Sequence, residues 1–298
     1  MIKESKVSKI SHCAFSDEAS YNIGRFRAIG MLSLSVSSLE EYEREVQKIL
    51  KESNIREFKW KKLKSARMYY GAIKLIDHFI ESAKRGISRI DVLVWDIEDK
   101  RHKIKRRDDC GNLARMYYHL FKNVLVMRWP SNLTWKLFPD ENSSIDWKTV
   151  KDCLRSKEIV VSEKKGLFRD FAIDIRREFN IKDLNEVKSS TTPLVGVTDL
   201  FAGMGVYSHL NFDKYQKWEY LNSEQGCIFP EFIKVKFSRS DEYRCPVIEY
   251  LYTQCRDQKL GVSLIERRGL WTPQPKNPIN FWNYKPQSDM DTAPTREN

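Results

Sequence analysis

The sequence lacks a hydrophobic run that could cross a membrane, because none approaches the roughly 18 uninterrupted apolar residues that a spanning helix needs. The basic residues at its start are followed by no apolar segment, so no secretory signal is predicted. Its basic clusters also lie on no strongly amphipathic apolar face, which argues against binding to a membrane surface. We therefore expect a cytoplasmic protein with no membrane partner.

Cysteine is scarce and scattered, with six residues among 298 and no C-x-x-C pair. No histidine stands at zinc-finger spacing from a cysteine. Closely spaced cysteines are typical of disulfide scaffolds and structural zinc sites, so neither is indicated. We expect free thiols in a reducing cytosol.

The short motifs of several enzyme classes are also missing. The sequence contains neither the G-x-x-x-x-G-K-[ST] phosphate-binding loop nor a G-x-S-x-G nucleophile turn. The Gly203-x-Gly205 pair lies within an apolar segment, where close helix packing is the natural cause of the glycines. Enzymes that use ATP, NAD or a serine nucleophile are therefore not predicted.

Positive charge is abundant and concentrated. The chain has 52 Lys+Arg against 41 Asp+Glu, a net charge of +11, and residues 56–136 alone hold 20 basic and 9 acidic residues. Two basic runs stand out, and they comprise Arg56, Lys59, Lys61, Lys62, Lys64 and Arg67, then Arg101, Lys103, Lys105, Arg106 and Arg107. Such clusters suit a polyanion, because each neutralised phosphate releases counterions. A solvated surface loop is the alternative for either run.

The hydrophobic pattern predicts alternating strands and helices. Apolar residues make up 41% of the chain and charged residues 31%, as in globular proteins. We expect strands over 12–17, 25–35, 89–97, 134–138 and 181–187, and helices over 38–52 (capped by Ser37 or Ser38), 66–85, 110–127, 146–154, 194–210 and 241–258. The amphipathic segment 165–178 is left open. An opening hairpin followed by alternating elements predicts an α/β fold with a mixed sheet flanked by helices.

The composition changes near residue 213, since residues 213–298 contain 13 basic and 12 acidic residues and are almost neutral. We expect a core domain over 1–212 and a C-terminal extension over 213–298 that packs on it, with a flexible tail from about 288. The extension is rich in aromatic residues, namely Trp271, Phe281, Trp282 and Tyr284. They either pin the extension to the core, which we favour, or stack on exposed bases.

Acidic residues occur at four places where the local pattern predicts apolar or neutral ones. They are Asp17-Glu18 at the end of the first strand, Glu57 before the helix 66–85, Asp140-Glu141 after the strand 134–138, and Asp199 inside the helix 194–210. Carboxylates that converge from distant positions are what hard divalent ions require. Two such ions about 4 Å apart activate a water and stabilise the leaving oxygen of a phosphodiester. Mg²⁺ or Mn²⁺ is therefore the expected cofactor.

Asp199 is the sharpest of these signals. It lies in an apolar segment with no cation within ten residues on either side. A buried carboxylate without a partner is costly unless it meets a metal or a proton, and a solvent-facing helix position is the alternative. Lys59 lies two residues after Glu57 and points to the same side if the segment is extended. It then offsets the charge of the site or holds a phosphate, unless it is an ordinary surface lysine.

These residues resemble a known family. The segments Asp17-Glu18-Ala19-Ser20 and Glu57-Phe58-Lys59-Trp60, Asp140 after a strand, and the helix Pro193-Leu194-Val195-Gly196-Val197-Thr198-Asp199-Leu200 are similar to the bacterial domain of unknown function 3800 family. The resemblance spans about residues 12–210, and residues 277–287 also look like some members. It implies a ribonuclease H-like fold over 1–212, in which carboxylates on the first strand, later strands and the last helix hold two metals. By that likeness Asp17, Glu57, Asp140 and Asp199 are the candidate ligands, with Glu18 and Glu141 as reserves.

Together these observations predict a divalent-metal-dependent nuclease that hydrolyses phosphodiester bonds by a two-metal mechanism. The basic runs are expected to follow the backbone of RNA, DNA or a hybrid, and the sequence leaves that choice and the oligomeric state open. One alternative is a non-catalytic nucleic-acid-binding or interaction protein of a defence or mobile-element system. Another is a structural or partner-binding protein whose charge only keeps it in solution.

Overall fold

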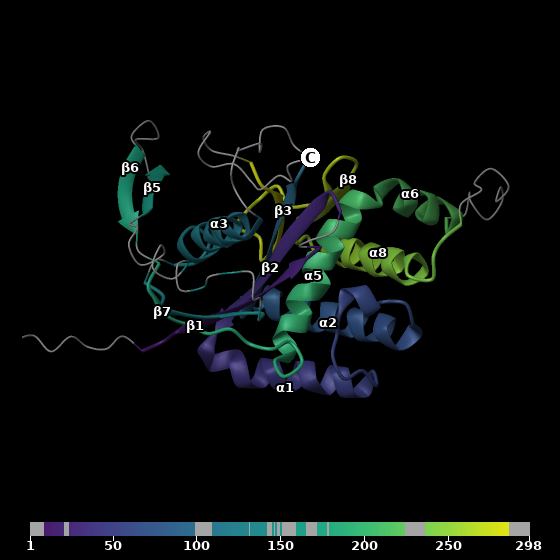
Figure 1. Cartoon of the computed structure of the whole chain (residues 1–298), viewed down its shortest axis with the longest axis horizontal. Coiled ribbons are helices and arrows are strands. Elements are labelled where there is room, and N and C mark those ends of the chain that lie inside the picture. Colours follow the sequence, from purple (N-terminus) through teal and green to yellow (C-terminus); the bar gives the residue numbers. More distant parts are fainter. Residues whose placement is uncertain are drawn as a thin grey trace, which may run out of the picture.

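The structure is a computed structural model in which elements from both ends of the chain share one sheet (Figure 1). It describes residues 9–20, 24–98, 109–130, 132–141, 145, 147, 150, 159–164, 172–177, 179–223 and 236–285. Within these ranges no helix is long and apolar enough to span a bilayer.

Six strands form the main sheet in the order β10-β3-β2-β1-β4-β7. They are β1 (His12–Ala19), β2 (Phe26–Ser35), β3 (Ser88–Asp96), β4 (Trp135–Pro139), β7 (Ile181–Leu184) and β10 (Ile279–Asn283). Strand β2 runs antiparallel to both β1 and β3, whereas β4 is parallel to β1, β7 to β4, and β10 to β3. The predicted mixed sheet of an α/β fold is confirmed, and it is compatible with a ribonuclease H-like arrangement.

Helices cover both faces of this sheet (Figure 1). One face carries α1 (Val36–Glu52), the short η1 (Trp60–Lys62), α2 (Ala66–Lys84), α5 (Pro193–Leu210), α6 (Phe212–Leu221) and α8 (Asp241–Asp257). The other carries α3 (Asp109–Phe121), which continues as the π-helical turn η3 (Lys122–Val126). Two small antiparallel pairs stand outside the main sheet, namely β5 (Ile159–Lys164) with β6 (Ala172–Arg177), and β8 (Ser263–Ile265) with β9 (Gly269–Trp271).

Each face of the sheet covers its own hydrophobic cluster. Successive side chains of β1 belong alternately to one cluster and the other. Phe15 belongs to the cluster under α1, α2, α5 and α8, and Ala14 belongs to the cluster under α3. Successive side chains of a strand point to opposite faces. Asp17 therefore shares the α5 face with Phe15, while Glu18 points to the α3 face.

Most expected elements are present, with shifts at their ends. The first helix begins at Val36, because Ser35 is the actual cap and accepts a hydrogen bond from the Ser37 N–H at 3.1 Å. The prediction of Ser37 or Ser38 as the cap is two or three residues late. The helix expected over 110–127 changes to π-helical geometry after Phe121. The segment 165–178, for which the sequence predicts no definite element, includes strand β6. Most of the expected helix 146–154 and the tail from 288 lie outside the described residues.

The C-terminal extension is fastened to the core through its aromatic residues. Phe281 is fully buried, Tyr284 is 7% exposed, and the Arg128 guanidinium lies 4.0 Å from the centre of the Trp282 ring. Arg89 adds a polar clamp, because its Nη2 donates to the carbonyl oxygen of Asn277 at 2.9 Å. The interpretation that these aromatics pin the extension to the core is confirmed for Phe281 and Tyr284.

Two close approaches fix α5 against the residues that precede it in the chain. A Cβ on Gly203 would lie 2.2 Å from Cγ of Trp60, and one on Gly30 would lie 2.7 Å from the carbonyl oxygen of Thr198. Neither position has room for a side chain. The expectation that Gly203 serves close packing is confirmed, and this contact sets the distance between α5 and the segment 57–63.

Candidate functional site

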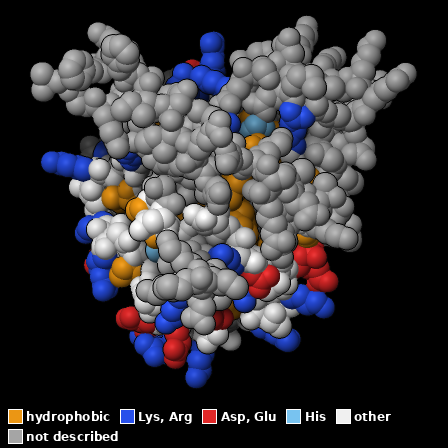
Figure 2. Space-filling model, turned by 90° about the vertical axis from the view of Figure 1, so that its left-hand side faces the viewer, with side chains coloured by type: hydrophobic (Ala, Val, Ile, Leu, Met, Phe, Trp, Pro, Cys, Tyr) orange, Lys and Arg blue, Asp and Glu red, His pale blue; other side chains and the backbone are white. Residues whose placement is uncertain are grey.

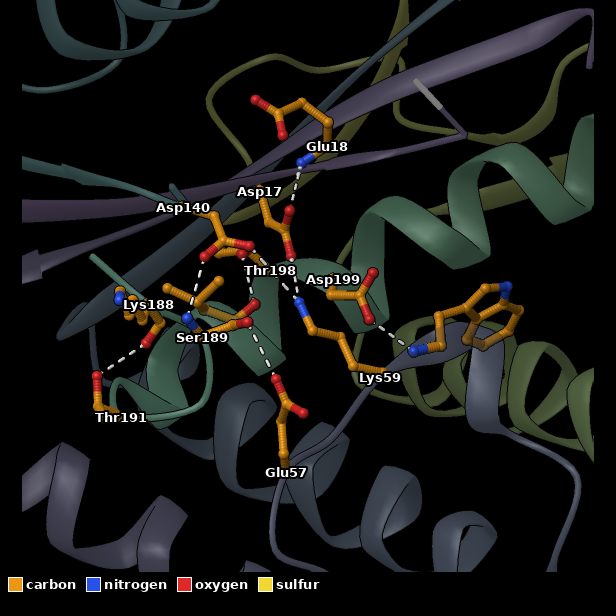
Figure 3. A network of polar contacts seen from close by, with 12 residues as sticks. Asp17, Glu18, Glu57, Lys59, Asp140, Lys188, Ser189, Thr191, Thr198 and Asp199 are labelled. Atoms are coloured by element: carbon orange, nitrogen blue, oxygen red, sulfur yellow. Dashed lines mark hydrogen bonds and ion pairs between the residues drawn. The ribbon is translucent and has the colours of Figure 1, made fainter. Parts of the chain in front are cut away.

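Three carboxylates gather around one lysine, where the end of β1, the end of β4 and the middle of α5 meet (Figure 3). The Lys59 ammonium lies 3.2 Å from Asp17 Oδ2 and 3.6 Å from Asp140 Oδ2. Asp199, on α5, lines the same hollow as Asp17 and Lys59, and its carboxylate turns toward the Trp60 N–H (Figure 3). We call Asp17, Asp140 and Asp199 the carboxylate cluster. Its members therefore come from three elements distant in sequence, and Lys59 comes from a fourth segment, just before η1.

Asp199 is held by the backbone of the segment that carries Lys59. Its Oδ2 accepts a hydrogen bond of 2.6 Å from the Trp60 N–H. The α5 residues on either side of Asp199 are buried, whereas Asp199 itself is partly exposed and lines a hollow that also contains Asp17 and Lys59. Asp199 therefore faces a pocket between elements and is tied to the backbone there.

Glu57 is connected to the cluster through Ser189. The Ser189 hydroxyl donates to Glu57 Oε1 at 3.0 Å, and the Ser189 N–H donates to Asp140 Oδ1, also at 3.0 Å. The other oxygen of Glu57 lies 3.5 Å from the Lys62 ammonium. Glu57 therefore lies outside the cluster and is connected to it through Ser189.

The carboxylate cluster is short of positive charge. Burial raises the pKa of Asp17 well above its ordinary value, and the charges of Asp199 and Asp140 raise it further, against the opposing effect of Lys59. Burial likewise raises the pKa of Asp199, although the Trp60 N–H and Lys59 oppose the shift. The pKa of Lys59 is raised because its carboxylate partners outweigh the effect of burial. An added cation would be stabilised at this place.

The two reserve carboxylates are not brought to the cluster. Glu18 follows Asp17 on β1, but its side chain points away from the cluster (Figure 3). On the other face of the sheet its Oε1 accepts a hydrogen bond from the Tyr117 hydroxyl. Glu141 is exposed and forms a surface ion pair with Lys188 at 3.8 Å. Of the six predicted ligands, the structure gathers Asp17, Asp140 and Asp199, with Glu57 beside them.

The chemistry of this donor set fits a hard divalent ion, since carboxylate oxygens are the ligands that Mg²⁺ and Mn²⁺ prefer. The raised pKa values of Asp17 and Asp199 mean that a bound cation would favour their charged forms. In the described part of the chain, however, no group of three or more His, Cys, Asp or Glu side chains is already arranged to hold a metal ion. The Lys59 ammonium occupies the space between Asp17 and Asp140. A metal would have to replace these ion pairs.

A groove of about 1230 Å³ opens beside Glu57, lined by the end of α1, the start of α2 and the loop between them. We call it the basic groove. Its cationic lining residues are Lys51, Arg56, Lys62, Lys64, Arg67 and Arg239. On the face drawn in Figure 2, by contrast, blue and red side chains are mixed at the lower end. A concave surface with these six cations against the single carboxylate of Glu57 suits a phosphate backbone.

The predicted basic residues separate into three groups. Lys62 and Lys64 line the basic groove. Lys59 and Lys61 line a second hollow of about 540 Å³, the carboxylate pocket, together with Asp17, Asp199, Trp60, Tyr207 and Arg244. The second run, Arg101, Lys103, Lys105, Arg106 and Arg107, lies outside the described residues.

Several residues of the site give no clear signal in the sequence. Ser189 stands in a run of Ser and Thr that reads only as a helix start, and Arg244 is one cation in an almost neutral segment. The Trp60 N–H is a backbone group, so no residue type could reveal its contact with Asp199. These residues join the site only through long-range packing.

The fold and the site define the class of protein: an α/β protein whose mixed sheet carries a carboxylate cluster around a lysine, next to a basic groove. The chain belongs to a family that includes two proteins of Methanothermobacter thermautotrophicus, "Uncharacterized protein ORF2'" and "Uncharacterized protein ORF2". It is 42% identical to the first and 40% to the second, and each match covers 95% of this chain and 97% of the relative. No protein-family model matches the chain.

Proposed function

We propose that the protein is a divalent-metal-dependent nuclease that hydrolyses phosphodiester bonds of a nucleic acid. The observation that carries this proposal is that Asp17 and Asp140 both pair with Lys59 while Asp199 lines the same pocket. Burial and the neighbouring carboxylates raise the pKa of Asp17 despite the nearby Lys59 ammonium, so the charged carboxylates are incompletely compensated, and Mg²⁺ or Mn²⁺ would supply the missing positive charge. The resemblance to the domain of unknown function 3800 family points to the same chemistry.

In this proposal Asp17, Asp140 and Asp199 hold the metal, and Glu57 is positioned next to them by Ser189. When bound, the metal ions would supply a water-derived nucleophile and stabilise the leaving oxygen. Lys59 balances the carboxylates in the metal-free protein. The basic groove would hold phosphates of the RNA, DNA or hybrid strand beside the cut.

A cytoplasmic location is part of the same proposal. Cys13, Cys245 and Cys255 are free and buried. Burial raises the pKa of each of these thiols, to about 12, 11 and 12 respectively, which keeps them protonated and unreactive. Free thiols of this kind suit a reducing compartment.

The test is a cleavage assay on single-stranded and duplex RNA and DNA and on a hybrid, with Mg²⁺, with Mn²⁺ and with chelator. The wild-type protein should cleave at least one substrate only when metal is present. Asp17→Asn and Asp199→Asn should lower the rate by more than the roughly 10- to 100-fold that loss of an outer-shell metal partner costs. Asp257→Asn, which changes an exposed carboxylate on α8, should match the wild type.

Cleavage that persists in chelator, or in both cluster variants, contradicts the proposal. A second assay follows the melting temperature as metal is added. Both ions should raise it in the wild type, because a ligand that binds the folded state stabilises it. They should not raise it in Asp17→Asn.

The alternative is a nucleic-acid-binding protein without catalysis, and the position of Lys59 favours it. The ammonium already pairs with Asp17 and Asp140, so the cluster can be partly neutralised without metal. This alternative expects salt-sensitive binding to nucleic acid, no cleavage, and a melting temperature that metal leaves unchanged.

A further inference from the structure

Arg244 reaches the carboxylate pocket from a part of the chain that the sequence sets apart as an extension. It lies on α8, and it lines the same hollow as Asp17, Lys59 and Asp199. The site is therefore built from both parts of the chain. A cation inside this pocket is close to any phosphate group that approaches the cluster.

The guanidinium of Arg244 is held in one orientation. Its Nη2 donates to the Trp60 carbonyl oxygen at 3.1 Å. Its central carbon lies 5.3 Å from the centre of the Trp60 ring and 5.7 Å from that of Tyr207, within the range of cation–π contacts. A side chain fixed in this way loses little conformational entropy when it binds a ligand.

The backbone of Trp60 connects Arg244 to the carboxylate cluster. The Trp60 N–H donates to Asp199, and its carbonyl oxygen accepts from Arg244. The guanidinium and the Asp199 carboxylate are thus oriented by the same residue.

Arg244 also has unused hydrogen-bonding capacity. Its Nε is buried and has no hydrogen-bond partner among the described residues. A buried donor without an acceptor is costly, so an acceptor that reaches this guanidinium would gain affinity. The planar fork of N–H groups matches the paired oxygens of a phosphate better than an ammonium does.

We propose that Arg244 binds a non-bridging phosphate oxygen of the nucleic-acid strand in the carboxylate pocket. This assignment rests on the proposed function for the identity of the substrate. It makes α8 part of the substrate-binding surface, and it places a cation beside the carboxylates where a polyanion would otherwise be repelled.

The experiment measures binding of a labelled strand, of whichever type the wild type binds best, in an Asp17→Asn background that prevents cleavage. Adding Arg244→Ala should weaken binding by about tenfold or more. It should also reduce the slope of log affinity against log salt by about one, because one phosphate contact is lost. Arg256→Ala removes an exposed arginine of the same helix and should change neither quantity.

Arg244→Lys is the second variant, and it keeps the charge while losing the fork. It should leave the salt slope unchanged and give an intermediate affinity. It also serves if Arg244→Ala fails to fold. Unchanged affinity and slope in a folded Arg244→Ala protein would overturn the inference. A second result would also overturn it. In the wild type, metal should raise the melting temperature; if an Arg244 variant with intact Asp17 loses this rise, Arg244 only positions the cluster.

The two proposals fail separately. If the wild type binds nucleic acid but never cleaves it, and Arg244→Ala still lowers affinity and slope, the nuclease proposal fails and the assignment of Arg244 stands. If the wild type cleaves with metal and Arg244→Ala binds and cleaves like it, only the assignment of Arg244 fails.

Discussion

Among single residues, Lys59 matters most for the stability of the carboxylate cluster, because its ammonium pairs with both Asp17 and Asp140. Replacing it by methionine, as Lys59→Met, leaves the cluster without its nearest cation. We expect a loss of roughly 1–3 kcal/mol in the free energy of unfolding, measured by urea titration in chelator at pH 8. The loss should shrink at lower pH, where the carboxylates can take up protons, and Mn²⁺ should restore part of it.

The matched control for that measurement is Lys74→Met. Lys74 pairs with Glu52 at 2.9 Å, but both side chains are about half exposed. Exposed ion pairs contribute little to stability, about 0–1 kcal/mol. If the free energy of unfolding falls equally in the two variants, Lys59 stabilises the protein no more than an ordinary surface lysine does.

Asp241, at the start of α8, should make the fold sensitive to acid. Burial raises its pKa, but hydrogen bonds from Tyr207, Ser238 and Lys214 outweigh burial and lower the pKa from 3.8 to about 2. The stabilisation is therefore present above about pH 4 and is lost as the pH falls through about 2. Urea unfolding should show Asp241→Asn to be less stable at pH 7 by up to about 2 kcal/mol, with the difference narrowing toward pH 2. Asp257→Asn should follow the wild type throughout.

The packing of helix α5 against η1 determines where Trp60 lies, and through Trp60 it affects the position of Asp199. A methyl group on Gly203 would collide with the Trp60 ring, and Trp60 holds Asp199 through its N–H. Gly203→Ala should therefore cost about 1–3 kcal/mol of stability by overpacking. It should also abolish the metal-induced rise in melting temperature.

A double-mutant cycle with Trp60→Ala checks this explanation. Trp60→Ala removes the ring that the new methyl group meets. The effects of the two substitutions on stability should then be less than additive, because neighbours in contact do not act independently. Additive losses would place the effect of Gly203→Ala elsewhere in α5.

The sequence predicts the elements better than it predicts their contacts. Strands β2 and β3 and helix α5 are long and strongly patterned, so their local composition is enough to identify them. Asp199 is identifiable because a carboxylate in an apolar helix is rare and costly. The pairing of Lys59 with two carboxylates depends on strand register and on the approach of α5, which no local pattern records. The same holds for the small strands β8 and β9 and for the final strand β10, whose pairing with β3 links residues far apart in the chain.

At the scale of the whole molecule, the C-terminal segment completes the fold as well as the pocket. Strand β10 pairs with β3 at the edge of the sheet, and α8 packs against α2 and α5. A chain that ends after residue 212 should therefore be insoluble or lack a cooperative unfolding transition, as followed by circular dichroism. A chain that ends after residue 285 keeps both elements and should unfold like the full chain. A stable, cooperative 1–212 fragment would show that the first part is an independent domain.

The parallel pairing of β3 with β10 also has a consequence for synthesis on the ribosome. Ile279 follows Asp96 by 183 positions, which takes about 10 to 40 s at the usual rates of translation. Throughout that interval the nascent chain has an apolar strand whose final neighbour does not yet exist, and unpaired strands of this kind readily associate with other chains. Chaperones that shield the growing polypeptide should matter more for this protein than for one whose edge strand is synthesised early.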